Sequence, residues 1–280
     1  MLAACGDDST VGSASPTAGG STLPPAGTDG PSPGTTAPGV IDHPTGADDV
    51  VLWIGYEGGF VPVEIAFQHL PALLVTGDGR VVQQGPQIEI HPGPLLPNLQ
   101  QRTITEGGVQ ELLALAAEHG LFEAGDYEGP EATVADAAHT VVRISANGTT
   151  IEHRAYALDI DPDVAGSEDR ARLAAFVERA TDLQTAVAAD ALGAEEPYEA
   201  DSYRIRATVV TDDSGYEIEP TVVDWPSTAS VRLADAVECA VVPADEAAPV
   251  FTGATQLTWF RDGDVTYQVA VVPSLPGESC

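Results

Sequence analysis

The chain has 280 residues, of which 43 are acidic and 11 are basic, and its formal net charge is −32. A field this negative argues against nucleic-acid binding, which needs a basic footprint, and against binding to anionic lipid surfaces. Two interpretations of the charge stay open. It keeps the protein soluble through mutual repulsion, or it attracts cations or a basic partner.

The chain begins with the pattern of a bacterial lipobox, Leu2-Ala3-Ala4-Cys5. Small residues before a cysteine fit a signal peptidase pocket, and the cysteine thiol then carries a diacylglycerol. The pattern predicts residues 1–5 as a truncated lipoprotein signal, with Cys5 lipidated and anchored to the outer face of the cell membrane. A complete signal has an apolar segment before the cleavage site, so the start codon was assigned too late or the leader was removed. The alternative is a chance occurrence in a cytoplasmic protein.

Residues 6–48 are rich in Gly, Ser, Thr, Pro, Ala and Asp. A segment of this composition buries too little apolar surface to offset the loss of chain entropy, so the sequence predicts a disordered tether. Its root-mean-square reach is roughly 35–40 Å. Such a tether holds a folded domain away from the membrane and within the cell wall.

An α+β domain is predicted over 49–190, and its first half contains strands and one helix. Continuous apolar residues predict a buried strand over 50–54, and the two runs 72–75 and 80–82 predict a hairpin around a Gly-Asp-Gly turn. Alternation predicts another strand over 87–90. A helix follows, with Thr105 as its N-cap and Gly120 at its end.

Residues 139–156 form the clearest hairpin pattern, because Asn147-Gly148 is a favoured two-residue turn. This turn sets Val142 opposite His153 and pairs Arg143 with Glu152 on the outer face. The register places His139 and His153 on opposite faces, so these two histidines cannot share a metal.

An acidic cluster follows the hairpin, with Asp159, Asp161 and Asp163 at alternate positions. Carboxylates in this arrangement can converge on calcium. An EF-hand loop would require Gly in place of Val164 and Glu in place of Arg170. The competing interpretation is a solvated acidic loop before the next helix, and no other cofactor is expected.

The predicted fold class is α+β, an antiparallel sheet with two helices on one face. The second helix is expected from Ser167, its N-cap, to about Leu183. A smaller β-rich unit is predicted over 200–280. It ends in a hairpin over 256–272, for which a three-residue loop places Trp259 and Tyr267 on one face.

The remaining two cysteines, Cys239 and Cys280, lie in this C-terminal unit. In an exported protein they are expected to form one disulfide that closes the unit. Its loop of roughly 40 residues is worth about 4 kcal/mol in the chain-entropy model. The alternative is two free thiols. A zinc site is not expected, because neither cysteine belongs to a cluster with metal-ligand spacing.

Three stretches, 77–82, 94–122 and 257–280, resemble uncharacterised exported lipoproteins of actinobacteria. The absence of lysine, together with abundant Ala, Gly, Val, Pro and Asp, is typical of the GC-rich coding of that group. The resemblance implies an extracytoplasmic location and the fold described above. It implies no activity.

The sequence contains none of the common catalytic motifs, such as a nucleophile elbow, a zinc-protease helix, a phosphate-binding loop or a dinucleotide fingerprint. The favoured hypothesis is a membrane-anchored extracytoplasmic lipoprotein that binds a cell-wall component or another exported protein without catalysis. The alternative is an envelope hydrolase whose active site is assembled from distant residues.

Overall fold

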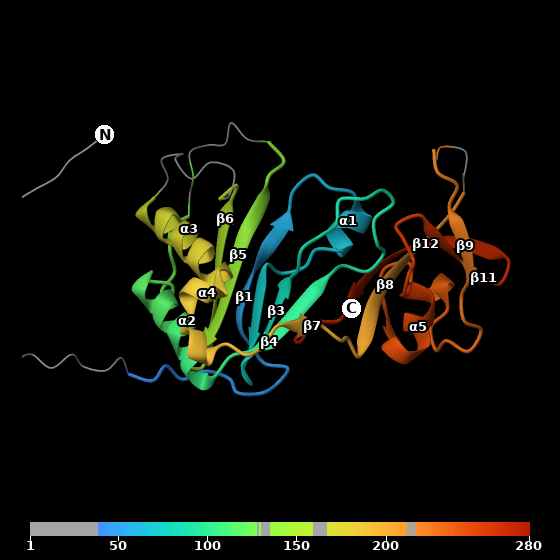
Figure 1. Ribbon diagram of the computed structural model, residues 1–280. Helices are drawn as coiled ribbons and strands as arrows, with labels where there is room; N and C mark the ends of the chain where they lie inside the picture. Colours follow the sequence, from blue (N-terminus) through green and yellow to red (C-terminus); the bar gives the residue numbers. More distant parts are fainter. Residues whose placement is uncertain (1–38, 128, 130–134, 159–166, 212–214, 216) are drawn as a thin grey trace, which may run out of the picture. The chain divides into compact units, whose positions relative to one another are not determined.

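A computed structural model of the chain describes residues 39–127, 129, 135–158, 167–211, 215 and 217–280. The described helices and strands belong to one compact unit, Val40–Cys280. The strands form two sheets (Figure 1). None of the helices in the described residues is long and apolar enough to cross a membrane.

The larger sheet has seven strands in the order β6-β5-β1-β2-β3-β4-β7, and every neighbouring pair is antiparallel. Its strands are β1 (Val50–Gly58), β2 (Leu73–Thr76), β3 (Arg80–Gln84), β4 (Leu99–Thr103), β5 (Ala138–Ala146), β6 (Thr149–Tyr156) and β7 (Glu196–Pro197). The short helix α1 (Val63–Phe67) follows β1.

Two main helices, α2 (Glu106–Glu118) and α3 (Glu168–Thr181), cover one face of this sheet, as predicted (Figure 1). The expected N-caps are confirmed, because the hydroxyls of Thr105 and Ser167 accept hydrogen bonds from backbone N–H groups three residues later. The apolar stripes of both helices share a core with β1, β5 and β6. The short α4 (Leu183–Ala186) and the 3₁₀ turn η1 (Ala189–Ala191) complete this layer.

The second sheet has five strands in the order β10-β8-β12-β11-β9 and is antiparallel except where β9 runs parallel to β11. Its strands are β8 (Ser202–Val209), β9 (Thr221–Asp224), β10 (Ala240–Pro243), β11 (Thr258–Asp262) and β12 (Val265–Pro273). The connections between them contain the 3₁₀ turn η2 (Leu233–Asp235) and the helix α5 (Ala244–Phe251). An aromatic cluster lies in its core, with three edge-on ring contacts and one tilted contact, and it is formed by Tyr203, Trp225, Phe251 and Phe260.

The predicted disulfide is present and joins Cys239 to Cys280, with 5.5 Å between the Cα atoms. It holds the segment after β12 against the rest of the unit. Leu275 of this segment is buried between the sheets in an apolar cluster with Leu74, Val82 and Val272. The C-terminal segment therefore lies where the two sheets meet.

The strand predicted over 87–90 is absent, and that prediction is wrong. Ile88 and Ile90 are 62% and 59% exposed. A strand needs a neighbouring strand with free backbone groups, but β4 takes the edge of β3, with Gln101 opposite Val82. The strand next to β3 in the sheet is therefore β4, and residues 87–90 form part of the connection between them.

The three-residue loop expected in the C-terminal hairpin is also wrong. Asp262 pairs with Val265, which leaves the two-residue loop Gly263-Asp264. Gly263 has a φ of +64°, which a two-residue loop requires at its first position. Phe260 therefore pairs with Tyr267, and Trp259 lies on the opposite face.

The described chain begins inside the stretch predicted as a tether. Ile41 exchanges two hydrogen bonds with the Gln110 side chain on α2, at 2.8 and 2.9 Å. The carbonyl of Asp42 accepts from the N–H of Asn147 at the β5–β6 turn. Residues 41–42 thus belong to the folded unit.

Candidate functional site

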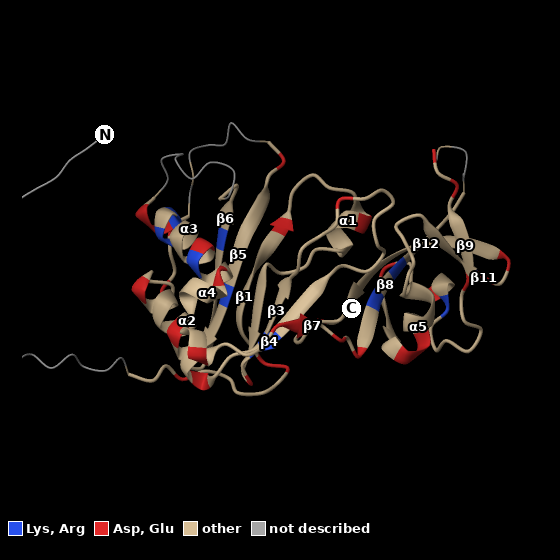
Figure 2. Ribbon diagram, viewed as in Figure 1, with Lys and Arg blue, Asp and Glu red and all other residues tan. Residues whose placement is uncertain are grey.

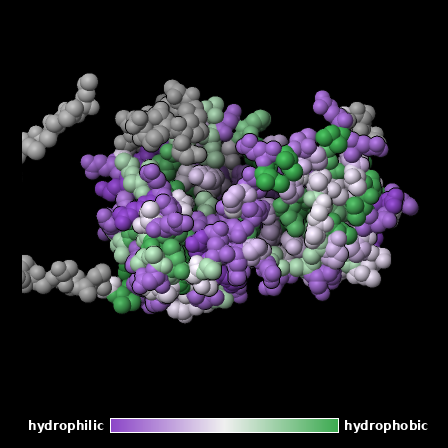
Figure 3. All heavy atoms as spheres, viewed as in Figure 1, coloured by the Kyte–Doolittle hydropathy of each residue, from purple (hydrophilic) through white to green (hydrophobic). Residues whose placement is uncertain are grey.

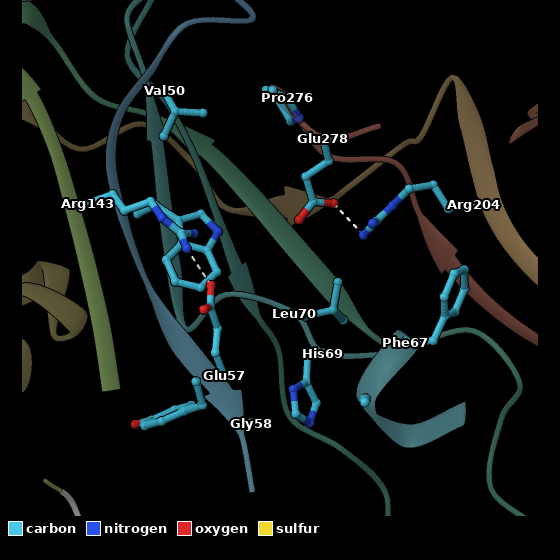
Figure 4. A pocket seen from close by; sticks show the side chains of 14 residues that line it. Val50, Glu57, Gly58, Phe67, His69, Leu70, Arg143, Arg204, Pro276 and Glu278 are labelled. Atoms are coloured by element: carbon cyan, nitrogen blue, oxygen red, sulfur yellow. Dashed lines mark hydrogen bonds and ion pairs between the residues drawn. The ribbon is translucent and has the colours of Figure 1, made fainter. Parts of the chain in front are cut away.

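A pocket of about 550 Å³ opens on the face of the seven-stranded sheet opposite α2 and α3 (Figure 4). It is called the inter-sheet pocket here, because β1 and β5 supply one wall, while β8 and the C-terminal segment supply the other. Its lining residues are Val50, Trp53, Tyr56, Glu57, Gly58, Ala66, Phe67, His69, Leu70, Arg143, Arg204, Pro276, Gly277 and Glu278.

The sheet wall is built around Trp53 on β1. A Cβ on Gly55 would lie 2.5 Å from the Trp53 ring, so the ring can lie flat along the strand because position 55 is glycine. The Arg143 guanidinium lies over the ring, with its carbon 4.6 Å from the ring centroid. The strand register explains this contact, because Trp53 is directly opposite Arg143.

Glu57 connects the arginines of this wall. Its carboxylate accepts hydrogen bonds from Arg143 at 2.5 Å and from Arg154 at 2.6 Å, and Arg143 also donates to Glu152 at 2.8 Å. Burial acts to raise the pKa of Glu57, but the hydrogen bonds from the two arginines outweigh it and hold the pKa below its usual value. This carboxylate is therefore ionised at neutral pH.

The opposite wall carries a second ion pair, in which Arg204 of β8 donates to Glu278 at 2.6 Å (Figure 4). Burial raises the pKa of Glu278, and the charge of Arg204 opposes this only in part. Hydrogen bonds of Ser274 fix the segment that carries Glu278. The Ser274 N–H donates to the Ser202 carbonyl, and the Ser202 hydroxyl donates to the Ser274 hydroxyl. The Ser274 carbonyl also accepts from the Tyr198 hydroxyl.

The floor and rim of the pocket are apolar. Leu70 is buried, and Phe67 packs against the same apolar cluster. The exposed side of α1 carries Val63 and Ile65, each 48% exposed, and Figure 3 shows strongly hydrophobic residues at the position of α1. The site therefore combines an apolar surface with two charged pairs.

The polar groups of this lining are mainly charged side chains, together with Tyr56 and His69. The fourteen lining residues, all within the described chain, include no Ser, Thr or Cys, and their carboxyl groups are those of Glu57 and Glu278. Glu57 is paired with Arg143, and Glu278 is paired with Arg204. Each pair therefore has no net charge when its carboxyl group is ionised. Acidic residues outnumber basic ones in the chain, and β8 carries two arginines, Arg204 and Arg206 (Figure 2).

Of the site residues predicted from the sequence, Cys5 and the acidic residues Asp159, Asp161 and Asp163 lie outside the described residues. Within the described part of the chain, no group of three or more His, Cys, Asp or Glu side chains could hold a metal ion. Cys239 and Cys280 are paired with each other. The predicted Arg143–Glu152 pair is confirmed and borders the pocket.

The remaining polar groups of the pocket were not identified from the sequence. Glu57, Arg204 and Glu278 are far apart along the chain and belong to no motif. The one local signal is the Trp53–Gly55 spacing, because a glycine two residues from a tryptophan in a strand leaves room for the ring.

A separate buried polar group lies between the sheet and the helices. His153 is 1% exposed, and its two ring nitrogens contact the Tyr127 hydroxyl at 2.6 Å and the Leu121 carbonyl at 2.8 Å. Burial lowers the pKa of His153, and burial raises the pKa of Tyr127 to about 12. Both ring nitrogens of His153 therefore have protein partners. The confirmed β5–β6 register keeps this residue away from His139.

Comparison of the chain with protein-family models, with curated protein sequences and with solved structures finds no match.

Proposed function

We propose that the chain is a membrane-anchored extracytoplasmic lipoprotein whose folded unit binds a component of the cell envelope without catalysis. The observation that carries the binding function is the inter-sheet pocket, where an apolar floor with Trp53 lies between two ion pairs. Pockets that combine a mostly apolar lining with a few positioned polar groups are typical ligand sites.

The location is supported by two features of the chain. The lipobox ends at Cys5, and the Cys239–Cys280 disulfide is of a kind that persists in oxidising compartments. Growth of the native host with an alkyne-tagged fatty acid should label the wild-type protein and should not label Cys5→Ser. Equal labelling of both proteins, or of neither, would contradict the anchor.

The binding function can be tested with the full chain carrying Cys5→Ser and with lysozyme-solubilised peptidoglycan fragments. We expect a saturable change in tryptophan fluorescence that Trp53→Phe removes. Trp259→Phe is the matched control, because it makes the same substitution at a tryptophan that lies outside the pocket lining. A signal that persists in Trp53→Phe, or no saturable signal in any of the three proteins, would refute binding at this pocket.

One observation favours a second function, an envelope hydrolase. The pocket contains two carboxyl groups whose pKa values shift in opposite directions, lowered for Glu57 and raised for Glu278, and acid–base pairs in enzymes show such a difference. Hydrolysis predicts soluble products from insoluble peptidoglycan, at a rate that falls at least about a hundredfold in Glu278→Gln. Binding alone predicts no product release.

A further inference from the structure

The two arginines of the inter-sheet pocket differ in how fully their donors are used. Arg143 donates through Nε to Glu152 and through Nη2 to Glu57, and its guanidinium also lies over Trp53. Arg204 has one carboxylate contact, from Nη2 to Glu278. Arg204 therefore makes fewer side-chain hydrogen bonds than Arg143, and its Nε, unlike that of Arg143, has no partner among the described residues.

The buried donor of Arg204 without a partner is its Nε. This atom is buried and has no hydrogen-bond partner among the residues that the structure describes. An unpaired buried donor is unfavourable by roughly 1–3 kcal/mol, more for a charged group, unless a partner satisfies it. The Arg204 side chain lines the pocket and is 15% exposed. The unpaired donor therefore belongs to a charged side chain at the pocket wall.

We propose that Arg204 binds the carboxylate of a small amphipathic molecule, whose apolar part packs against Phe67 and Leu70. This inference rests on the proposed binding function and names the ligand class of the same pocket. The ligand carboxylate accepts from both Nε and Nη2 of Arg204 and displaces the Glu278 side chain. Arginine is suited to this contact, because its planar fork matches the two oxygens of a carboxylate.

The surroundings of Arg204 favour a monoanion with an apolar body. The Arg204 guanidinium carbon is 6.0 Å from the Phe67 ring centroid, and Leu70 is buried nearby in the floor. Glu57 and Glu278 also line the pocket, so a dianion such as phosphate would be repelled more strongly than a carboxylate. A cation would gain least, because Glu57 already has two arginine partners.

Glu278 is the displaceable partner in this exchange. It makes a single contact with Arg204, and burial favours its neutral form. Replacement of one carboxylate by another keeps the charge on Arg204 compensated and adds the bond to Nε.

The test uses the full chain carrying Cys5→Ser and the Arg Nε–H signals of its 15N spectrum. The 11 basic residues are all arginines, so this region holds few signals. Titration with 3-phenylpropionate should shift the Arg204 signal in a saturable way, and 3-phenylpropionamide should leave it unchanged. Glu278→Gln removes the competing carboxylate and should tighten binding of the acid about tenfold, which corresponds to about 1.4 kcal/mol.

Arg204→Lys retains the charge but lacks the fork and should weaken binding at least about tenfold. The matched control is Arg261→Lys, because Arg261 forms an exposed pair with Asp224 outside the pocket. Thermal melting establishes that each variant is folded. If Arg204→Lys is unfolded, the comparison of wild type with Glu278→Gln still decides the question.

Equal shifts with the acid and the amide, or no saturable shift in both wild type and Glu278→Gln, would overturn the inference. The outcome also separates this inference from the proposed function. If peptidoglycan fragments change the Trp53 fluorescence but phenylpropionate does not bind, the carboxylate inference fails while the envelope-binding function stands. If phenylpropionate binds and the fragments do not, the carboxylate site stands without that function.

Discussion

Removal of the Cys239–Cys280 disulfide should lower the free energy of unfolding by about 4 kcal/mol. The two cysteines are 41 positions apart, and the chain-entropy relation for such a loop gives about 13 cal/mol/K, or about 4 kcal/mol at room temperature. Cys239 is half-buried and Cys280 is exposed, so little packing is lost with the sulfur atoms. The double variant Cys239→Ala/Cys280→Ala isolates the contribution of loop closure.

The measurement is urea denaturation followed by tryptophan fluorescence, in a background of Cys5→Ser. For a unit of this size, a loss of about 4 kcal/mol corresponds to a fall in melting temperature of about 8–16 °C. Dithiothreitol should destabilise the parent protein by the same amount and leave the double variant unchanged. A loss below about 1 kcal/mol, or an equal effect of reductant on both proteins, would refute the loop-closure reasoning.

Three further predictions concern single residues. Gly79→Ala should lower the unfolding free energy by about 2 kcal/mol or more, because φ is +82° and the new Cβ would lie 2.3 Å from the Ile104 carbonyl oxygen. Gly148→Ala, with φ +73° and open space around it, should lose only about 1 kcal/mol, and urea denaturation of both variants checks the difference. Burial lowers the pKa of His153, so the unfolded state binds more protons below about pH 6.5 and stability falls as the pH drops. His153→Gln should flatten that slope in denaturation curves between pH 7.5 and 5, and an unchanged slope would contradict the assignment. Glu57→Gln should lower stability at pH 7 by less than about 1 kcal/mol, because this side chain is one-third exposed. The pKa of Glu57 is lowered in the fold, so the contribution is present above about pH 4.3 and is lost as the pH falls; a difference between the two proteins that stays constant from pH 6 to 3 would contradict it.

Local turn chemistry made the β5–β6 hairpin predictable. Asn147 and Gly148 adopt φ values of +53° and +73°, which a two-residue turn requires and which few other residue pairs tolerate. Once this turn is placed, the partners of the whole hairpin follow, including Val142 opposite His153. The helix N-caps were predictable for the same reason, because each depends on a contact within one turn of helix.

The C-terminal hairpin lacked such a signal. Trp259 and Phe260 are 5% and 0% exposed, so both faces of β11 are buried and the side chains do not alternate between apolar and polar. Register is specified by the hydrophobic pattern only where one face is polar. The apolar pattern therefore could not distinguish a two-residue loop from a three-residue loop.

The pocket could not be predicted because its walls meet through long-range packing. Glu57, Arg143, Arg204 and Glu278 come from β1, β5, β8 and the C-terminal segment. Sequence patterns describe neighbours within a helix or across a hairpin, which is why the Arg143–Glu152 pair was found. The packing of the two sheets, which brings Arg204 and Glu278 toward the sheet wall, has no signature of that kind.

The net charge of −32 bears directly on which ligand this pocket can hold. An anion that approaches the protein is repelled at long range, so it binds only where a local contact outweighs that repulsion. At Arg204 the incoming carboxylate replaces Glu278 rather than adding to it, and the number of carboxylates in contact with the guanidinium stays at one. The gain then comes from the unpaired Nε and from apolar contact with Phe67 and Leu70. Selection for an apolar body is therefore a consequence of the charge, because a small polar anion would meet the same repulsion without the apolar contribution.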